Sequence, residues 1–105
     1  MFKCNVTVRI LRPEYGADGE VSYTEFTTDA LRIERRERRH GDLPPTFREC
    51  TEFLIPPPAE VRPGDLLCCD GERFELDDVR VCRNLDGTLV AHRCQIAHHH
   101  QVAER

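Results

Sequence analysis

A histidine and two cysteines in the last quarter of the chain are the residues whose types and spacing best fit metal chemistry. His92 and Cys94 are two positions apart, so on a strand both would point to the same face of a sheet. Cys82 could lie across a hairpin from them, and three histidines follow at 98–100. Because zinc binds cysteine and histidine in a tetrahedral arrangement, one hypothesis is a small zinc-binding or redox β domain that uses Cys82, His92 and Cys94.

The simpler interpretation of these residues is structural. Two cysteines separated by two residues, a frequent half of a zinc site, do not occur in the sequence, and the neighbours Cys68 and Cys69 would point to opposite faces of a strand. Cysteine also packs in protein cores as a small hydrophobic residue. We therefore favour Cys82 and Cys94 as core residues, treat 98–100 as part of a solvated tail, and expect no cofactor.

Other patterns that could support catalysis are weak. The chain has six cysteines, and none lies in a recognisable nucleophile signature. The carboxylates Asp77 and Asp78 are adjacent, so on a strand they would diverge instead of working as a pair. The six glycines are scattered over turn positions and do not form a phosphate-binding loop. We therefore predict a protein that is not an enzyme.

A run of arginines in the first half of the chain is the strongest charge feature. Its members are Arg35, Arg36, Arg38 and Arg39. Such a run could follow a phosphate backbone, but Glu34 and Glu37 interrupt it and the whole chain has a formal net charge of −4. An exposed, self-paired charged segment is the favoured interpretation, with an arginine patch that faces another protein as the next. We expect no specific nucleic-acid binding.

Alternating apolar and polar residues predict that these side chains lie on a β scaffold. Strands are expected at 2–12, 21–28, 31–40, 46–55, 66–69, 73–83 and 88–97, with the 31–40 segment projecting into solvent as a strand or a charged loop. A bulge is expected at Asp77–Asp78, and Pro56, Pro57 and Pro58 should form a rigid extended segment. The prediction is an all-β fold, a small six- to seven-stranded barrel or sandwich with a long charged loop.

Length and composition fit one domain. The chain has 105 residues, which is enough for one core, and we expect a single β-barrel-like domain over 1–97 followed by a flexible tail at 98–105. No apolar run approaches the roughly 20 residues of a membrane helix, and the N-terminus lacks a charged-then-apolar signal segment. A cytoplasmic protein without a membrane partner, its cysteines reduced, is expected.

The second half of the chain also resembles a known family, the small tailed-phage head–tail joining proteins, which include head-closure and tail-completion proteins. The resemblance extends over residues 50–97 and rests on a Pro-Gly-Asp turn before a short strand, a glycine turn, a longer strand and a final hairpin. The segments that carry it are Phe53–Pro56, Val61–Leu66, Asp70–Leu76, Val79 and Asp86–Gly87. The cysteines are not part of this pattern.

The resemblance implies a structural function without catalysis. It implies a subunit that self-associates into a ring between the capsid portal or adaptor and the tail, first in the cytoplasm and then in the virion. Loops that extend from each barrel would contact neighbouring subunits and the adjoining rings. The segments in those positions here are 35–45, which contains the arginine run, and the loop of Pro56, Pro57 and Pro58.

Overall fold

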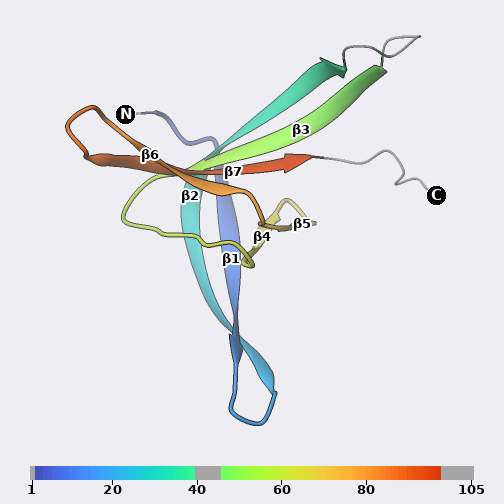
Figure 1. The fold of residues 1–105 in the computed structure, drawn as a ribbon, viewed down its shortest axis with the longest axis vertical. Helices are drawn as coiled ribbons and strands as arrows, with labels where there is room; N and C mark the ends of the chain where they lie inside the picture. The colour runs from blue at the N-terminus through green and yellow to red at the C-terminus, as the bar shows by residue number, and fades with distance from the viewer. Residues whose placement is uncertain (1, 40–45, 98–105) are drawn as a thin grey trace.

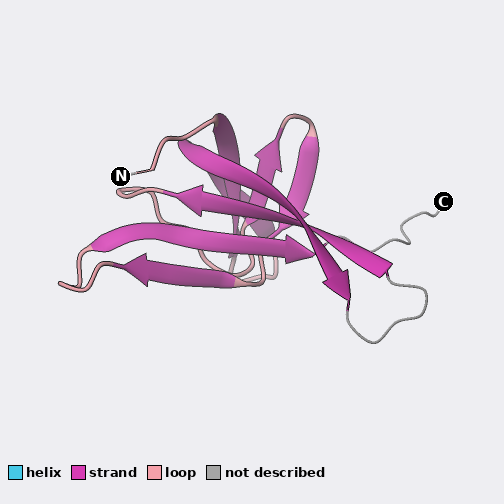
Figure 2. Ribbon diagram, turned by 90° about the horizontal axis from the view of Figure 1, so that it is seen from above, coloured by secondary structure: helices cyan, strands magenta, loops and turns pink. Residues whose placement is uncertain are grey.

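The fold is one antiparallel sheet that curls into a half-barrel (Figure 1). The computed structural model describes residues 2–39 and 46–97. Within these residues there are seven strands: β1 (Val6–Tyr15), β2 (Val21–Arg39), β3 (Thr46–Ile55), β4 (Leu66–Cys69), β5 (Glu72–Glu75), β6 (Val79–Arg83) and β7 (Leu89–Ala97). Their order in the sheet is β5-β4-β1-β2-β3-β7-β6. The expected all-β fold class is confirmed, and Figure 2 shows the described chain as strands and loops.

The strand β2 connects the two halves of the sheet, and it differs from the prediction. The sequence indicated two separate strands at 21–28 and 31–40, whereas β2 runs without a break for 19 residues. Its first part pairs with β1 as far as Ala30, and its second part pairs with β3 from Leu31 onward. Ala30 is completely buried where the partner changes. Because its small side chain fits that crowded position, one strand can serve both halves of the sheet.

The predicted long strand at 73–83 with a bulge at Asp77–Asp78 is wrong. The segment forms two strands, because β5 pairs with β4 and β6 pairs with β7, at the two opposite edges of the sheet. The connection between them is anchored by the backbone N–H of Gln95, which donates to the Asp78 carbonyl at 3.2 Å. A register shift does occur, but it lies between Cys82 and Arg83.

Two proline positions also depart from the prediction. Pro56, Pro57 and Pro58 were expected to extend, but the chain turns at Pro57 and Pro58, which are joined by a cis peptide bond. Pro13 was expected in a loop but lies inside β1, opposite Tyr23. A proline is tolerated there because β4 pairs with β1 only over 9–11, so no ladder partner requires the missing N–H.

The core lies on the concave face of the curled sheet. It consists of Val8, Ile10, Ala30, Phe53, Ile55, Val61, Leu67, Cys69, Phe74, Leu76 and Cys94. The rings of Phe53 and Phe74 pack at a centroid distance of 5.7 Å and a tilt of 55°, which joins β3 to β5 across the concave side. Every strand except β6 contributes a member, so this small core connects both halves of the sheet.

Candidate protein-interaction surfaces

The three residues of the hypothetical metal site do not come together. Cys82 pairs with Ala91, whereas His92 pairs with Val81, so Cys82 points to the opposite face of the β6–β7 ladder from His92. His92 and Cys94 do share the concave face, as their spacing predicted. Within 2–39 and 46–97, no group of three or more His, Cys, Asp or Glu side chains is placed to hold a metal ion. The histidines at 98–100 lie outside the described residues.

His92 and Cys94 are both buried, and Cys94 belongs to the core as the simpler interpretation predicted. The same prediction is wrong for Cys82, which is only partly buried and lies outside the core. Burial raises the pKa of the Cys94 thiol to about 12, and the charges of Asp65 and Asp78 add to the effect. The thiol therefore stays protonated at neutral pH, and a protonated thiol is a poor nucleophile and metal ligand. The described residues offer the buried Nδ1 of His92 no hydrogen-bond partner.

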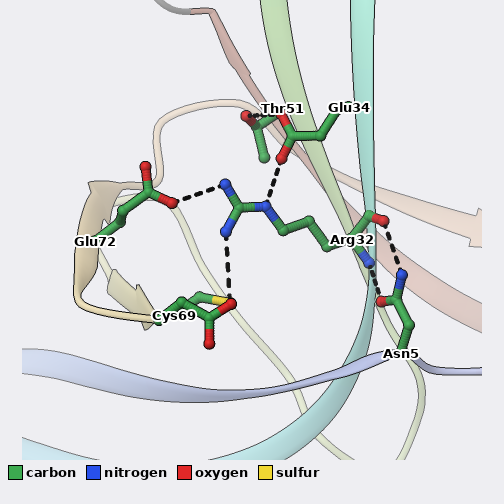
Figure 3. A network of polar contacts seen from close by, with 7 residues as sticks. Asn5, Arg32, Glu34, Thr51, Cys69 and Glu72 are labelled. Atoms are coloured by element: carbon green, nitrogen blue, oxygen red, sulfur yellow. Dashed lines mark hydrogen bonds and ion pairs between the residues drawn. The ribbon is translucent and has the colours of Figure 1, made fainter.

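The most extensive polar network is centred on Arg32 of β2 (Figure 3). Its Nε lies 2.5 Å from Glu34 and its Nη2 lies 2.8 Å from Glu72 of β5. Its Nη1 contacts the Cys69 sulfur at 3.6 Å. The guanidinium stands 5.5 Å from the ring centroid of Phe53 and 5.7 Å from that of Phe74. The arginine thus covers the aromatic pair and ties the β4–β5 hairpin to β2.

The arrangement around Arg32 is structural in its chemistry. The neighbouring carboxylates raise the pKa of the guanidinium further above its ordinary value, although burial opposes them as the largest single influence. Burial likewise raises the pKa of the Cys69 thiol, against the effect of its hydrogen bond from Arg32. Asn5 fixes the backbone at this point, because its side chain accepts from the Arg32 N–H at 2.8 Å and donates to the Arg32 carbonyl at 3.2 Å.

A second charged contact holds the Pro-Gly-Asp turn that carried the family resemblance. The carboxylate of Asp65, 2% exposed, accepts from Arg12 at both oxygens, at 3.1 and 3.0 Å. It also accepts from the backbone N–H of Arg62 at 2.9 Å. The turn is closed by Gly64, whose φ of +97° suits glycine. This ion pair anchors the crossing segment 56–65 to β1. Removing either partner would leave the other charge without compensation in a buried place, which destabilises the fold.

The predicted arginine run lies on the β2–β3 hairpin, which projects beyond the core (Figure 1). The Arg35 side chain is 47% exposed and lies 3.4 Å from the buried Glu52, while Arg36 is 67% exposed and lies 3.9 Å from Glu49. Arg38 and Arg39 belong to the backbone of β2, and their side chains lie outside the described residues. The predicted strand that projects into solvent is therefore present, and we call this hairpin, 33–39 with 46–52, the basic arm.

The proline loop is less prominent than expected. Pro56 and Pro57 are half-buried and Pro58 is exposed. The neighbouring Ala59 packs against the core and Val61 is part of it. The loop thus lies along the body of the domain as it crosses from β3 to β4, instead of extending away from it.

Three of the large exposed apolar side chains lie together on another hairpin, in a region that the sequence reasoning missed. Tyr15, Val21 and Tyr23 are 75%, 49% and 55% exposed. Tyr15 pairs with Val21, and Pro13 pairs with Tyr23, so all four lie on one face of the β1–β2 hairpin. The signal was available, because Val21 and Tyr23 alternate with polar residues while the segment carries few other apolar positions to form a core.

The tip of this hairpin is acidic as well as aromatic. Residues 13–25, which we call the acidic arm, carry four carboxylates, at Glu14, Asp18, Glu20 and Glu25, and no lysine or arginine. The hydroxyl of Thr24 donates to the carboxylate of Glu14 across the two strands.

The third projection is the β6–β7 hairpin. It exposes Leu85 completely and Val81 by half.

Comparisons with protein families and with curated proteins supply no family for this chain. A scan of protein-family models finds no match, and a search of curated proteins finds no relative. Among the described residues, no helix is long and apolar enough to cross a membrane. The geometry of the arms is therefore the main guide to function.

Proposed function

We propose that the protein is a non-catalytic structural subunit of phage or prophage virion assembly, which joins the head to the tail through contacts with neighbouring subunits. The single observation that carries the proposal is the division of the molecule into a small buried core and hairpins that project from it. The alternative of a zinc-binding or redox domain has less support, because Cys82 points away from His92 and Cys94.

The shape of the chain supports an assembly role. The radius of gyration is 16.0 Å, and the extents are 49 × 42 × 23 Å, whereas a compact domain of this length has a radius of gyration of about 13 Å. Each ordered residue costs roughly 1–2 kcal/mol of conformational entropy. If the arms had no use beyond the monomer, shortening them would therefore cost the protein little stability. Projecting hairpins are useful where their surfaces are covered by another subunit.

The side chains on the arms support the same role. The acidic arm exposes two tyrosines, and the basic arm exposes arginines, which are residue types enriched at the energetic centres of protein interfaces. The charged groups beside the core are engaged in internal pairs instead, such as Arg12 with Asp65. Recognition through the arms would leave the barrel unchanged on assembly, as is usual for pre-organised partners.

The test is deletion of the coding sequence from the phage or prophage that carries it, followed by electron microscopy of the particles. We expect filled heads and separate, complete tails, and we expect joined particles again when the intact protein is supplied from a plasmid. Normal joined particles without the protein would contradict the proposal. Native mass spectrometry of the purified chain, with and without a chelator, tests the alternative, since a stoichiometric zinc adduct would favour it.

A further inference from the structure

The two arms differ in charge, and they lie at the two ends of one strand. The acidic arm holds four carboxylates and no basic residue over 13–25, while the basic arm, 33–39 with 46–52, holds five arginines against four acidic residues. Both arms share β2, whose 19 residues run without a break and bend between the two arms. Figure 1 shows them leaving the core in different directions. The arms of one molecule therefore cannot contact each other.

We propose that the acidic arm of one molecule binds the basic arm of a second copy, so that the chains join head to tail. The occupant is a second copy because the chain itself carries both complementary surfaces. The apolar part of the contact would be Tyr15, Val21 and Tyr23, and the charged part would include Arg36. Tyrosine and arginine combine well, because a guanidinium stacks on an aromatic face and its charge is attracted to the ring.

The sheet edges are poorer candidates for self-association. The edge strands β5 and β6 are only four and five residues long. Glu72, Arg73 and Glu75 are exposed along β5, and β6 carries a register shift after Cys82. Short, charged and irregular edges are the features by which proteins prevent strand addition.

A contact between two different surfaces has a geometric consequence. Each molecule would offer one acidic arm and one basic arm. A row of bound subunits would therefore have a free acidic arm at one end and a free basic arm at the other. Such a heterologous interface closes into a ring if the rotation per subunit permits, or otherwise continues as a filament. The inference deepens the proposed function and rests on it, because it assigns the surfaces from which a joining ring would be built.

The test uses two variants of the full chain, each with one defective arm. Tyr15→Ser with Tyr23→Ser removes the aromatic face of the acidic arm, and Arg36→Glu reverses a charge on the basic arm. Sedimentation velocity and native mass spectrometry at low salt should show oligomers of the original chain. Each variant alone should associate at least about tenfold more weakly, as expected for truncation of an interface hot spot.

Mixing the two variants is the decisive step. The double tyrosine variant keeps a working basic arm, and the Arg36→Glu variant keeps a working acidic arm. The mixture should therefore form one-to-one heterodimers that grow no further. Higher salt should weaken the oligomers, because the Debye length falls from about 10 Å at 0.1 M to about 3 Å at 1 M. Glu60→Lys, an exposed change on the crossing segment and outside both arms, is the control and should associate as the original chain does.

Three results would overturn the inference: an original chain that stays monomeric at every soluble concentration, variants that associate as it does, or a mixture that gives no heterodimer. These outcomes are separate from the test of the proposed function. If particles fail to join without the protein but the purified chain never self-associates, the joining role stands and this interface does not. If the interface is found and deletion leaves particles joined, the reverse holds.

Discussion

Two arginines four residues apart on β2 show how differently the core and the arms use the same side chain. Arg32 is 16% exposed in its side chain, contacts two carboxylates at 2.5 and 2.8 Å and stands over the rings of Phe53 and Phe74. Arg36 is 67% exposed, with Glu49 at 3.9 Å. An exposed ion pair such as that of Arg36 contributes about 0–1 kcal/mol to stability. Arg32 is largely buried and has several partners, so it contributes more to the stability of the fold.

The difference teaches that charge in this protein has two roles, which are separated by position along the strand. In the core, each charged group is fixed by several partners, so its loss affects folding. On the arms, charged and aromatic groups make few contacts that unfolding would break. Their substitution should therefore affect association alone.

Asp65→Ala should be the most damaging of these changes. It leaves the guanidinium of Arg12 and the N–H of Arg62 without the buried carboxylate that they share. Removing one partner of a buried ion pair typically costs about 3–5 kcal/mol, and the partial exposure of Arg12 places the expected loss toward the lower end. Urea denaturation followed by circular dichroism measures it. Glu60→Ala, an exposed carboxylate on the same segment, should change stability by less than about 0.5 kcal/mol.

Arg32→Lys should destabilise the protein by about 2 kcal/mol, because lysine keeps the charge but loses the planar group that bonds two carboxylates and covers two rings. The value is below the sum of the contacts, since Glu34 and Glu72 are more than half exposed and solvent screens them. The control is Arg36→Lys, which should leave the urea midpoint unchanged. Equal losses at the two positions would remove the distinction between core and arm.

The sequence was sufficient for the class of fold because the signals were local. Local residue patterns identified β3, β4 and β7 closely, and Asp-Gly pairs identified the turns at Gly71 and Gly87. It was insufficient for the ladder partners, which depend on distant residues. The apparent strand at 73–83 divides because its two halves pair at opposite edges of the sheet, a fact that no local pattern contains.

The candidate surfaces were foreseeable in the same partial way. The arginine run could be placed on a projecting segment because Arg35 and Arg36 have few apolar neighbours to bury them. The acidic arm was missed because the predicted strands ended at residue 12 and began again at residue 21, which left Tyr15 between them. The pairing of Tyr15 with Val21 becomes visible only in the register of β1 with β2. Likewise Cys82 and His92 looked adjacent, and one position of register puts them on opposite faces.

Raising the pH should destabilise the core through Cys94. Its pKa is raised to about 12 in the folded protein, so above pH 9 the unfolded chain releases a proton that the folded chain retains. Stability is therefore full below pH 9 and falls as the pH rises toward 12. At pH 10 the loss should be about 1.4 kcal/mol, because one pKa unit corresponds to about 1.4 kcal/mol.

Urea denaturation at pH 7 and pH 10 measures this effect, and Cys94→Ala provides the matched comparison. The variant has no thiol at this position, so its loss of stability between the two pH values should be smaller than that of the original chain by about the same 1.4 kcal/mol. If the two proteins respond equally to pH, the Cys94 thiol titrates in the folded state as it does in the unfolded chain, and its place in a closed core is disproved.

The smallest effect on folding should come from the acidic arm. Tyr15→Ser with Tyr23→Ser changes two side chains that are more than half exposed, so the free energy of unfolding should stay within about 0.5 kcal/mol. Phe26→Ser is the control on the same hairpin, because Phe26 points to the other face, packs against the core and lies 5.7 Å from the Arg12 guanidinium. It should cost about 2 kcal/mol, less than a fully buried phenylalanine. A large loss from the tyrosine pair would mean that the arm stabilises its own barrel, and its exposed aromatic face would then need no partner to explain it.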